Sequence, residues 1–157
     1  MQLKLTDTER KNLRKRKIRK TDMSGFAPDE LEEILQVSTQ RAREILALID
    51  FQQIPSVGIK FAEDLIYLGY YAVDSLKGLD GARLVEEFEA RKGYQIDSCV
   101  EDQFRLAVYF AETNDRSKNW WDFTAERKQY RTENGYPQNR PTAIWHEVVP
   151  VKWKNTG

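Results

Sequence analysis

The sequence contains very few of the residues that build disulfides, metal sites and membrane spans. Among its 157 residues there is one cysteine, Cys99, and one histidine, His146. A single cysteine excludes an intrachain disulfide, and together these two residues cannot supply the ligands of a structural zinc site. No run approaches the roughly 18 apolar residues of a transmembrane helix, and the basic N-terminus has no signal-peptide pattern. We therefore expect a cytoplasmic protein.

The sequence motifs of common enzyme classes are also missing. There is no P-loop, no dinucleotide-binding glycine motif and no nucleophile elbow. Glu101 and Asp102 are adjacent and would diverge on a helix, which indicates partners of a helix dipole rather than a catalytic pair. Asp97 and Glu101 oppose ionisation of Cys99, so we expect a buried, inert thiol. We predict no enzymatic activity, no catalytic residues, no cofactor and no metal ion.

The net charge of zero conceals a strong asymmetry along the chain. The 25 basic residues balance 25 acidic ones, but residues 1–20 hold nine basic and two acidic residues. This basic arm therefore carries +7 and the rest of the chain −7. Such a pattern indicates contact with nucleic acid, or an arm that folds back on its own acidic body. The arm cations that we expect to contact phosphates are Lys11, Arg14, Lys15, Arg16, Lys17, Arg19 and Lys20.

Helix signals recur along the whole chain. Thr6 and Glu9 form a capping box, and we predict a helix from there to about Lys20. Only Leu13 and Ile18 give this helix apolar surface, so we expect it to dock loosely. A linker over residues 21–27 follows. Further helices are predicted at about 28–35, 39–50, 59–68, 74–76, 81–92, 99–111 and 124–130 from caps, glycine stops and apolar spacing.

Together these signals predict an all-α protein with a single domain. A basic arm and linker cover residues 1–27, and a helix-hairpin-helix domain covers residues 28–133. Residues 134–157 contain three prolines and should form an extended tail packed on the domain.

Residues 51–61, Phe-Gln-Gln-Ile-Pro-Ser-Val-Gly-Ile-Lys-Phe, look like the turn of a helix-hairpin-helix. A tight turn between two helices leaves free backbone N–H groups at the start of the second helix. These groups and the helix dipole attract an anion such as phosphate. An ordinary helix-to-helix turn is the alternative interpretation. The residues predicted to contact phosphate here are Ser56, Val57, Gly58 and Lys60.

A weak repeat places a second turn 22 residues later. Residues 76–80 align with residues 54–58, and an amphipathic helix follows both. The second copy has Ala82 where the first has Lys60, and it carries Asp80 in its turn with Arg83 as its nearest cation. We therefore expect the first turn to contact nucleic acid and the second mainly to pack.

The segment Trp120-Trp121-Asp122-Phe123 combines three aromatic residues with the nearby cations Arg127, Lys128 and Arg131. Such a segment could stack the bases of a single strand or anchor a protein partner. We favour core packing for Trp121 and Phe123, with Trp120 at the rim.

Several of these stretches carry a family resemblance. Residues 51–65, 68–70, 75–78, 97–111 and 120–128 resemble small bacterial proteins of the pathogenicity-locus (Cdd1-like) helix-hairpin-helix family. The middle of the chain is more distantly similar to the C-terminal domain of TfoX-type competence regulators. The resemblance implies a small helical protein with tandem hairpins that binds DNA, with phosphate-facing candidates Ser56, Val57, Gly58 and Lys60. Ser56 departs from the glycine usual in such hairpins.

The combined prediction is a non-catalytic, sequence-tolerant DNA-binding protein that uses the first hairpin and the basic arm. The alternative is a protein–protein interaction module, in which the hairpins are a scaffold and the Trp-rich segment contacts the partner.

Overall fold

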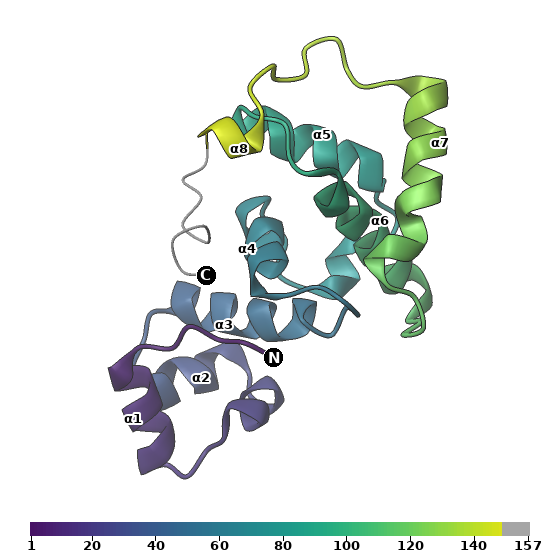
Figure 1. Cartoon of the computed structure of the whole chain (residues 1–157). Coiled ribbons are helices and arrows are strands. Elements are labelled where there is room, and N and C mark those ends of the chain that lie inside the picture. The colour runs from purple at the N-terminus through teal and green to yellow at the C-terminus, as the bar shows by residue number, and fades with distance from the viewer. Residues whose placement is uncertain (149–157) are drawn as a thin grey trace. The chain divides into compact units, whose positions relative to one another are not determined.

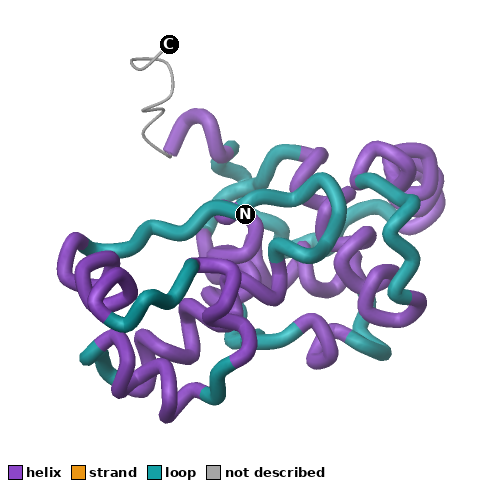
Figure 2. The backbone as a smooth tube through the Cα atoms, turned by 90° about the horizontal axis from the view of Figure 1, so that it is seen from below, coloured by secondary structure: helices purple, strands orange, loops and turns teal. Residues whose placement is uncertain are grey.

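The computed structural model describes residues 1–148 and confirms the all-α class (Figures 1 and 2). Within this range the β contribution is one isolated bridge, between Gln95 and Ile144. No described helix is long and apolar enough to cross a membrane. In chain order the elements are α1 Asp7–Lys15, η1 Lys20–Gly25, α2 Pro28–Leu35, α3 Thr39–Phe51, α4 Ile59–Tyr67, η2 Val73–Leu76, α5 Gly81–Lys92, α6 Ser98–Thr113, η3 Trp120–Phe123, α7 Thr124–Asn134 and α8 Trp145–Val148, where η denotes a 3-10 helix.

The chain forms two compact units, each with its own contacts. Unit 1 is Met1–Leu76 and unit 2 begins at Lys77. This division differs from the boundaries at 27/28 and 133/134 that the sequence indicated. The basic arm belongs to unit 1 and the described part of the tail belongs to unit 2, so both are described with the helices on which they pack.

The basic arm is part of the core of unit 1. Leu5 and Leu13 from the arm and Met23 from η1 are buried in one apolar cluster with α2 and α3. Met23 is fully buried although it lies in the segment that the sequence presented as a linker. The expectation of a loosely docked arm was therefore wrong. The other members of the cluster are Leu31, Ile34, Leu35, Ala42 and Ile45.

Helix α1 ends at Lys15, five residues before the predicted end. Lys17 takes a left-handed conformation with φ of 56°, and the Ile18 N–H donates to the Leu13 carbonyl at 2.9 Å. On a continuous helix Leu13 and Ile18 would point about 140° apart. The turn instead brings both side chains to the apolar cluster of unit 1. Leu13 is buried inside this cluster, and the partly buried Ile18 packs against it.

The remaining helices of unit 1 follow their local signals closely. Ser38 caps α3 by accepting from the Arg41 N–H at 3.1 Å, as predicted. Helix α4 buries Phe61, Ala62 and Leu65, which recur at helical spacing. These α3 and α4 helices pack on each other and hold the turn between them in place.

Unit 2 is built on the contact between α5 and α6, which Figure 1 shows lying against each other. A Cβ atom added to Gly81 would lie 3.0 Å from the Cα of Arg105, so only glycine fits there without a shift. Asp97 caps α6 by accepting from the Cys99 N–H, as predicted. Burial and the nearby Asp97 raise the pKa of the half-buried Cys99 thiol to about 11.

Three buried carboxylates connect the helices of unit 2. Glu89, Glu101 and Asp102 are each about 1% exposed. Each is bound by an arginine that comes from α7 or from the segment after it. Glu101 and Asp102 were expected to be partners of the helix dipole; Glu101 does lie in the first turn of α6, and both side chains are in addition bound by arginines of α7. The pairs are Glu89 with Arg140 at 2.8 Å, Glu101 with Arg131 at 2.8 Å and Asp102 with Arg127 at 2.6 Å.

The predicted tail runs back over α5 and α6 as far as it is described. Gln95 exchanges backbone hydrogen bonds with Ala143 and Trp145, each 2.8 Å long. Tyr136 lies between two guanidinium groups, with Arg131 4.0 Å and Arg140 3.5 Å from its ring centre. The described part of this tail ends in a short helix, α8, over Trp145–Val148, and residues 149–157 of the predicted tail lie outside the described residues.

The Trp-rich segment forms the 3-10 helix η3 on the surface of unit 2. Trp121 is 54% exposed, whereas Trp120 and Phe123 are partly buried. Phe123 packs against the Tyr109 ring at 5.4 Å, which fixes the segment on α6. The predicted core packing was therefore wrong for Trp121, and Trp121 rather than Trp120 is the more exposed of the two indoles.

Candidate nucleic-acid interface

The candidate interface begins at the turn between α3 and α4. Ile54 is 1% exposed and anchors the turn in the core of unit 1. Pro55 and Ser56 then reverse the chain, with Ser56 in the left-handed region at φ of 61°. Gly58 is the N-cap of α4, and unlike Ser38 at the start of α3 it has no side chain that can accept a hydrogen bond. We call Ser56–Lys60 the first corner.

The backbone N–H groups of the first corner are not used within the protein. Among residues 1–148, the N–H groups of Val57, Gly58, Ile59 and Lys60 donate no hydrogen bond, and the first helical bond comes from Ala62 to the Gly58 carbonyl at 3.2 Å. A Cβ atom added to Gly58 would meet no atom within 4 Å. The corner is therefore open on its Gly58 side, and its amides can receive an anion.

Lys60 adds the nearest cation to this corner. Its side chain is 87% exposed, and its Nζ lies 3.8 Å from the Asp64 carboxylate one turn further along α4. A long contact between such exposed groups holds the lysine weakly. Lys60 can therefore swing toward an anion bound at the amides. Ser56, the other predicted contact, is exposed at the same corner.

The start of α5 is the corresponding place in unit 2, and two of its backbone N–H groups, those of Gly78 and Ala82, donate to carboxylates. We call Gly78–Ala82 the second corner. The Asp80 carboxylate accepts from the Ala82 N–H at 2.9 Å, and the Glu112 carboxylate of α6 accepts from the Gly78 N–H. Gly81 is pressed against Arg105 of α6. Two carboxylates therefore already accept hydrogen bonds at the second corner, and their negative charge opposes the binding of an anion there.

The seven predicted arm cations are all exposed on unit 1. Arg19 pairs with Asp22 at 3.3 Å, and this ion pair raises the pKa of Arg19. The other six have no ion-pair partner among the described residues. These six residues, which we call the arm patch, are Lys11, Arg14, Lys15, Arg16, Lys17 and Lys20.

The structure does not merge the arm patch and the first corner into one site. The arm is tied to the end of α2, where Asn12 donates to the Leu35 carbonyl, and to the start of α3, where Arg41 binds Glu9. The first corner follows the other end of α3. Thirteen helical residues span about 20 Å, so the two cationic features are separated by a distance of that order.

The other cations considered from sequence are committed to the protein itself. Arg127 and Arg131 bind the buried carboxylates Asp102 and Glu101, so neither is available beside the Trp-rich segment. Lys128 is exposed on α7. Sequence reasoning missed this network because its carboxylates lie on helices and their partners are 25 to 51 residues away.

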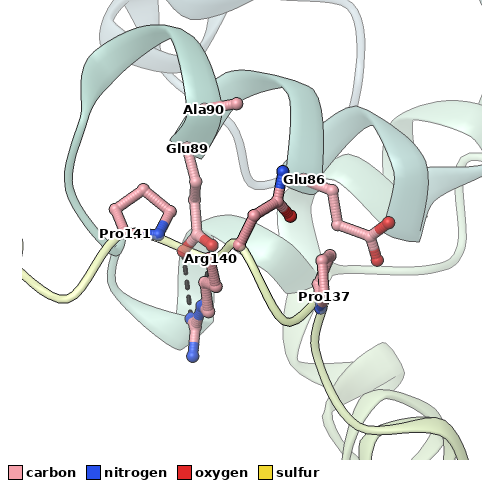
Figure 3. Close-up of a pocket in the computed structure, with 7 residues that line it drawn as sticks. Glu86, Glu89, Ala90, Pro137, Arg140 and Pro141 are labelled. Atoms are coloured by element: carbon pink, nitrogen blue, oxygen red, sulfur yellow. Dashed lines mark hydrogen bonds and ion pairs between the residues drawn. The ribbon is translucent and has the colours of Figure 1, made fainter.

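The network also borders a cavity of about 240 Å³ in unit 2 (Figure 3). The Glu89 carboxylate at its wall is bound by both the Nε and Nη2 atoms of Arg140, at 2.8 and 3.0 Å. Its polar wall groups are thus largely satisfied by one another. The lining residues are Glu86, Glu89, Ala90, Pro137, Asn139, Arg140 and Pro141.

Comparison with known proteins places this chain in a family. The sequence profile of the pathogenicity locus (Cdd1) family matches residues 44–129, which is more than half of the chain. The chain belongs to the pathogenicity-locus family. It is also similar to the mitomycin resistance protein McrB of Streptomyces lavendulae, with 29% identity over 94 residues that cover 60% of this chain and 89% of that protein. No solved structure matches significantly.

The family match divides the candidate interface into two parts. Both corners lie inside the residues shared with the pathogenicity-locus family. The arm patch, helix α1 and helix α2 precede the match. The first corner therefore lies within the part of the chain that matches the family, whereas the basic arm lies outside it.

Proposed function

We propose that this protein binds DNA without catalysis and with little sequence preference, through phosphates held at the first corner and at the arm patch. The backbone N–H groups of Val57–Lys60, which donate no hydrogen bond within residues 1–148, are the observation that carries the proposal. Oriented amides at a helix N-terminus attract a phosphate, and Lys60 adds a mobile positive charge. The helix-hairpin-helix interpretation of α3–α4 and the relation to TfoX-type regulators belong to this proposal.

Phosphate contacts explain why we expect little sequence preference. Backbone amides and lysines that bind phosphate fix the position of a protein on a duplex but do not distinguish bases. The arm patch adds six exposed cations to the corner. Binding that releases counterions from several phosphates weakens steeply with salt, so the affinity should fall with rising ionic strength.

The carboxylates of unit 1 limit which surface can face DNA. Unit 1 contains twelve basic and twelve acidic residues, so its formal charge is zero. Four of the acidic residues, Asp29, Glu30, Glu32 and Glu33, lie on α2. The arm patch can therefore attract DNA only where these carboxylates face away from the duplex.

The test is fluorescence anisotropy with a labelled duplex of about 16 base pairs at two salt concentrations. We expect the paired substitutions Gly58→Ala and Lys60→Glu to weaken binding of different sequences equally. Gly58→Ala adds only a methyl group in open space, so the fold should persist. Arg83→Glu in unit 2 is the matched control and should have little effect. Unchanged binding by a folded double variant would contradict the proposal.

A second function is favoured by the exposure of Trp121. An indole that is 54% exposed on a rigid 3-10 helix can anchor a protein partner. In this interaction-module function, Trp121→Ala would abolish capture of the partner, whereas the Gly58 and Lys60 variants would not. DNA binding that survives Trp121→Ala and is lost on changing the first corner would favour the first proposal.

A further inference from the structure

The basic arm is held by a buried ion pair at its base. Glu9 is 3% exposed, and both of its carboxylate oxygens are bound by Arg41 of α3, from Nε at 2.8 Å and from Nη2 at 2.9 Å. Arg41 also donates to the Lys4 carbonyl at 3.0 Å. A bidentate pair of this kind fixes both the distance and the direction between two helices. We call Glu9 and Arg41 the clamp.

Two further contacts hold the arm on either side of the clamp. Asn12 donates to the Leu35 carbonyl at 2.8 Å. Gln2 and Gln52 exchange two hydrogen bonds of 2.8 and 2.7 Å, which tie the extended N-terminal residues to the end of α3. Figure 1 shows these residues running along α3 before α1 begins. The arm patch, carried by α1 and by the turn and 3-10 helix η1 that follow it, is therefore held against the rest of unit 1.

We infer that the clamp makes unit 1 a two-point binder of duplex DNA, with the arm patch and the first corner contacting phosphates of one duplex. This inference rests on the proposed function. It adds the substrate class, double-stranded rather than single-stranded DNA, and it makes Glu9 and Arg41 positioning residues. Both clamp residues, Glu9 and Arg41, precede the residues that match the family.

The separation of the two features favours a duplex. A span of about 20 Å corresponds to about six base pairs at 3.4 Å per base pair. A duplex is stiff over this length, since its persistence length is about 150 base pairs, and it presents phosphates at fixed positions. Two rigid patches can meet such a ligand at once, and the second contact then gains from a high effective concentration. A single strand must be ordered to span the same distance.

The clamp gives a test in which its effect and simple electrostatics have opposite signs. Glu9→Gln removes one negative charge next to the arm patch, so charge alone predicts tighter binding of any nucleic acid. Loss of the clamp frees the arm, so the inference predicts binding of a duplex weakened by about five-fold. Binding of a single strand of the same length should be unchanged or slightly tighter.

Asp7→Asn is the matched control for charge. Asp7 lies on the same helix, its side chain is 97% exposed, and its contact is with the neighbouring Arg10 rather than with α3. This variant should bind both forms of DNA as tightly as the wild type or slightly more tightly. Asn12→Ala tests the positioning of the arm separately from its charge. This variant removes the hydrogen bond from Asn12 to the Leu35 carbonyl and leaves the net charge of the protein unchanged. It should weaken duplex binding and leave single-strand binding unchanged.

The readouts are anisotropy with the duplex and the single strand, and circular dichroism to check folding of each variant. If Glu9→Gln tightens duplex binding as Asp7→Asn does, and Asn12→Ala has no effect, the inference is overturned while the proposed function can stand. If Glu9→Gln does not fold, Asn12→Ala decides the question alone. If the Gly58 and Lys60 variants bind as the wild type does, the proposed function fails, whatever the clamp variants show.

Discussion

The first and second corners are similar in sequence position but differ in how their helix N-termini are satisfied. At the first corner Gly58 provides no cap and the amides of Val57–Lys60 are unpaired among the described residues. At the second corner the Ala82 N–H donates to Asp80 and the Gly78 N–H donates to Glu112. A helix terminus that already binds carboxylates cannot also bind a phosphate. We therefore assign phosphate binding to the first corner and the packing of α5 on α6 to the second corner.

The glycines of the two corners show the same contrast. Gly81 lets α5 approach the backbone of α6, whereas Gly58 faces open space. Glycine is thus required for packing at one corner and leaves room for a ligand at the other. The predictions below test this contrast, from the largest expected effect to the smallest.

Gly81→Ala should have the largest effect on stability. The new methyl group would overpack the contact with Arg105, which costs about 1 to 3 kcal/mol in the free energy of unfolding. Gly58→Ala should change that free energy by less than about 0.5 kcal/mol. Circular dichroism during urea unfolding follows the helices of both units, so it measures the loss of stability in both variants. Equal losses of stability for the two variants would show that the corners do not differ in packing.

Asp80→Ala should destabilise unit 2 without changing DNA binding. Removal of an N-cap carboxylate that accepts from Ala82 costs about 1 kcal/mol. Urea unfolding followed by tryptophan fluorescence measures this loss, and anisotropy measures binding. A clear change in DNA affinity in the folded variant would indicate that the second corner also contacts DNA.

Lys60→Ala should lower the salt dependence of binding slightly. Removal of one phosphate contact reduces the slope of log affinity against log salt by about 1. Arg83→Ala, the matched change near the second corner, should leave the slope unchanged. Anisotropy titrations at four salt concentrations give both slopes. Equal slopes for the two variants would remove Lys60 from the interface.

Lowering the pH should reduce the free energy of unfolding of unit 1, because acid protonates Glu9 of the clamp. Hydrogen bonds from Arg41 hold the pKa of Glu9 below its ordinary value of 4.5. Ionised Glu9 therefore stabilises the folded unit fully at pH values above 4.5, and this stabilisation is lost as the pH falls through the lower folded pKa. Glu9→Gln should remove that part of the pH dependence. Urea unfolding followed by circular dichroism, repeated at pH values between 7 and about 3, measures the free energy of unfolding of the wild type and of the variant.

The sequence predicted the elements whose signals are local. The capping box of Thr6 and Glu9, the Ser38 and Asp97 caps and the Gly93 stop are all present in the structure. Each depends on residues within about four positions of the helix end, so one sequence is enough to identify it. The open geometry of the first corner followed from the same kind of signal.

The sequence failed where distant residues decide the outcome. The buried Glu101 looks like any solvated carboxylate on a helix until Arg131, thirty residues away, is seen to bind it. The arm looked too polar to dock, but Glu9 is neutralised by Arg41 and Leu13 enters the core. Trp121 was placed inside because aromatic residues usually pack, and its neighbour Phe123 makes that contact instead.

The most direct test of the account is to give the first corner the cap of the second. Gly58→Asp places a carboxylate at the N-cap of α4, where it can accept from the unpaired amides as Asp80 does in α5. We predict that the folded unit becomes more stable by a few tenths of a kcal/mol, while its affinity for duplex DNA falls at least about ten-fold. Wild-type affinity in this variant, with the cap formed, would contradict the claim that the open amides hold phosphate.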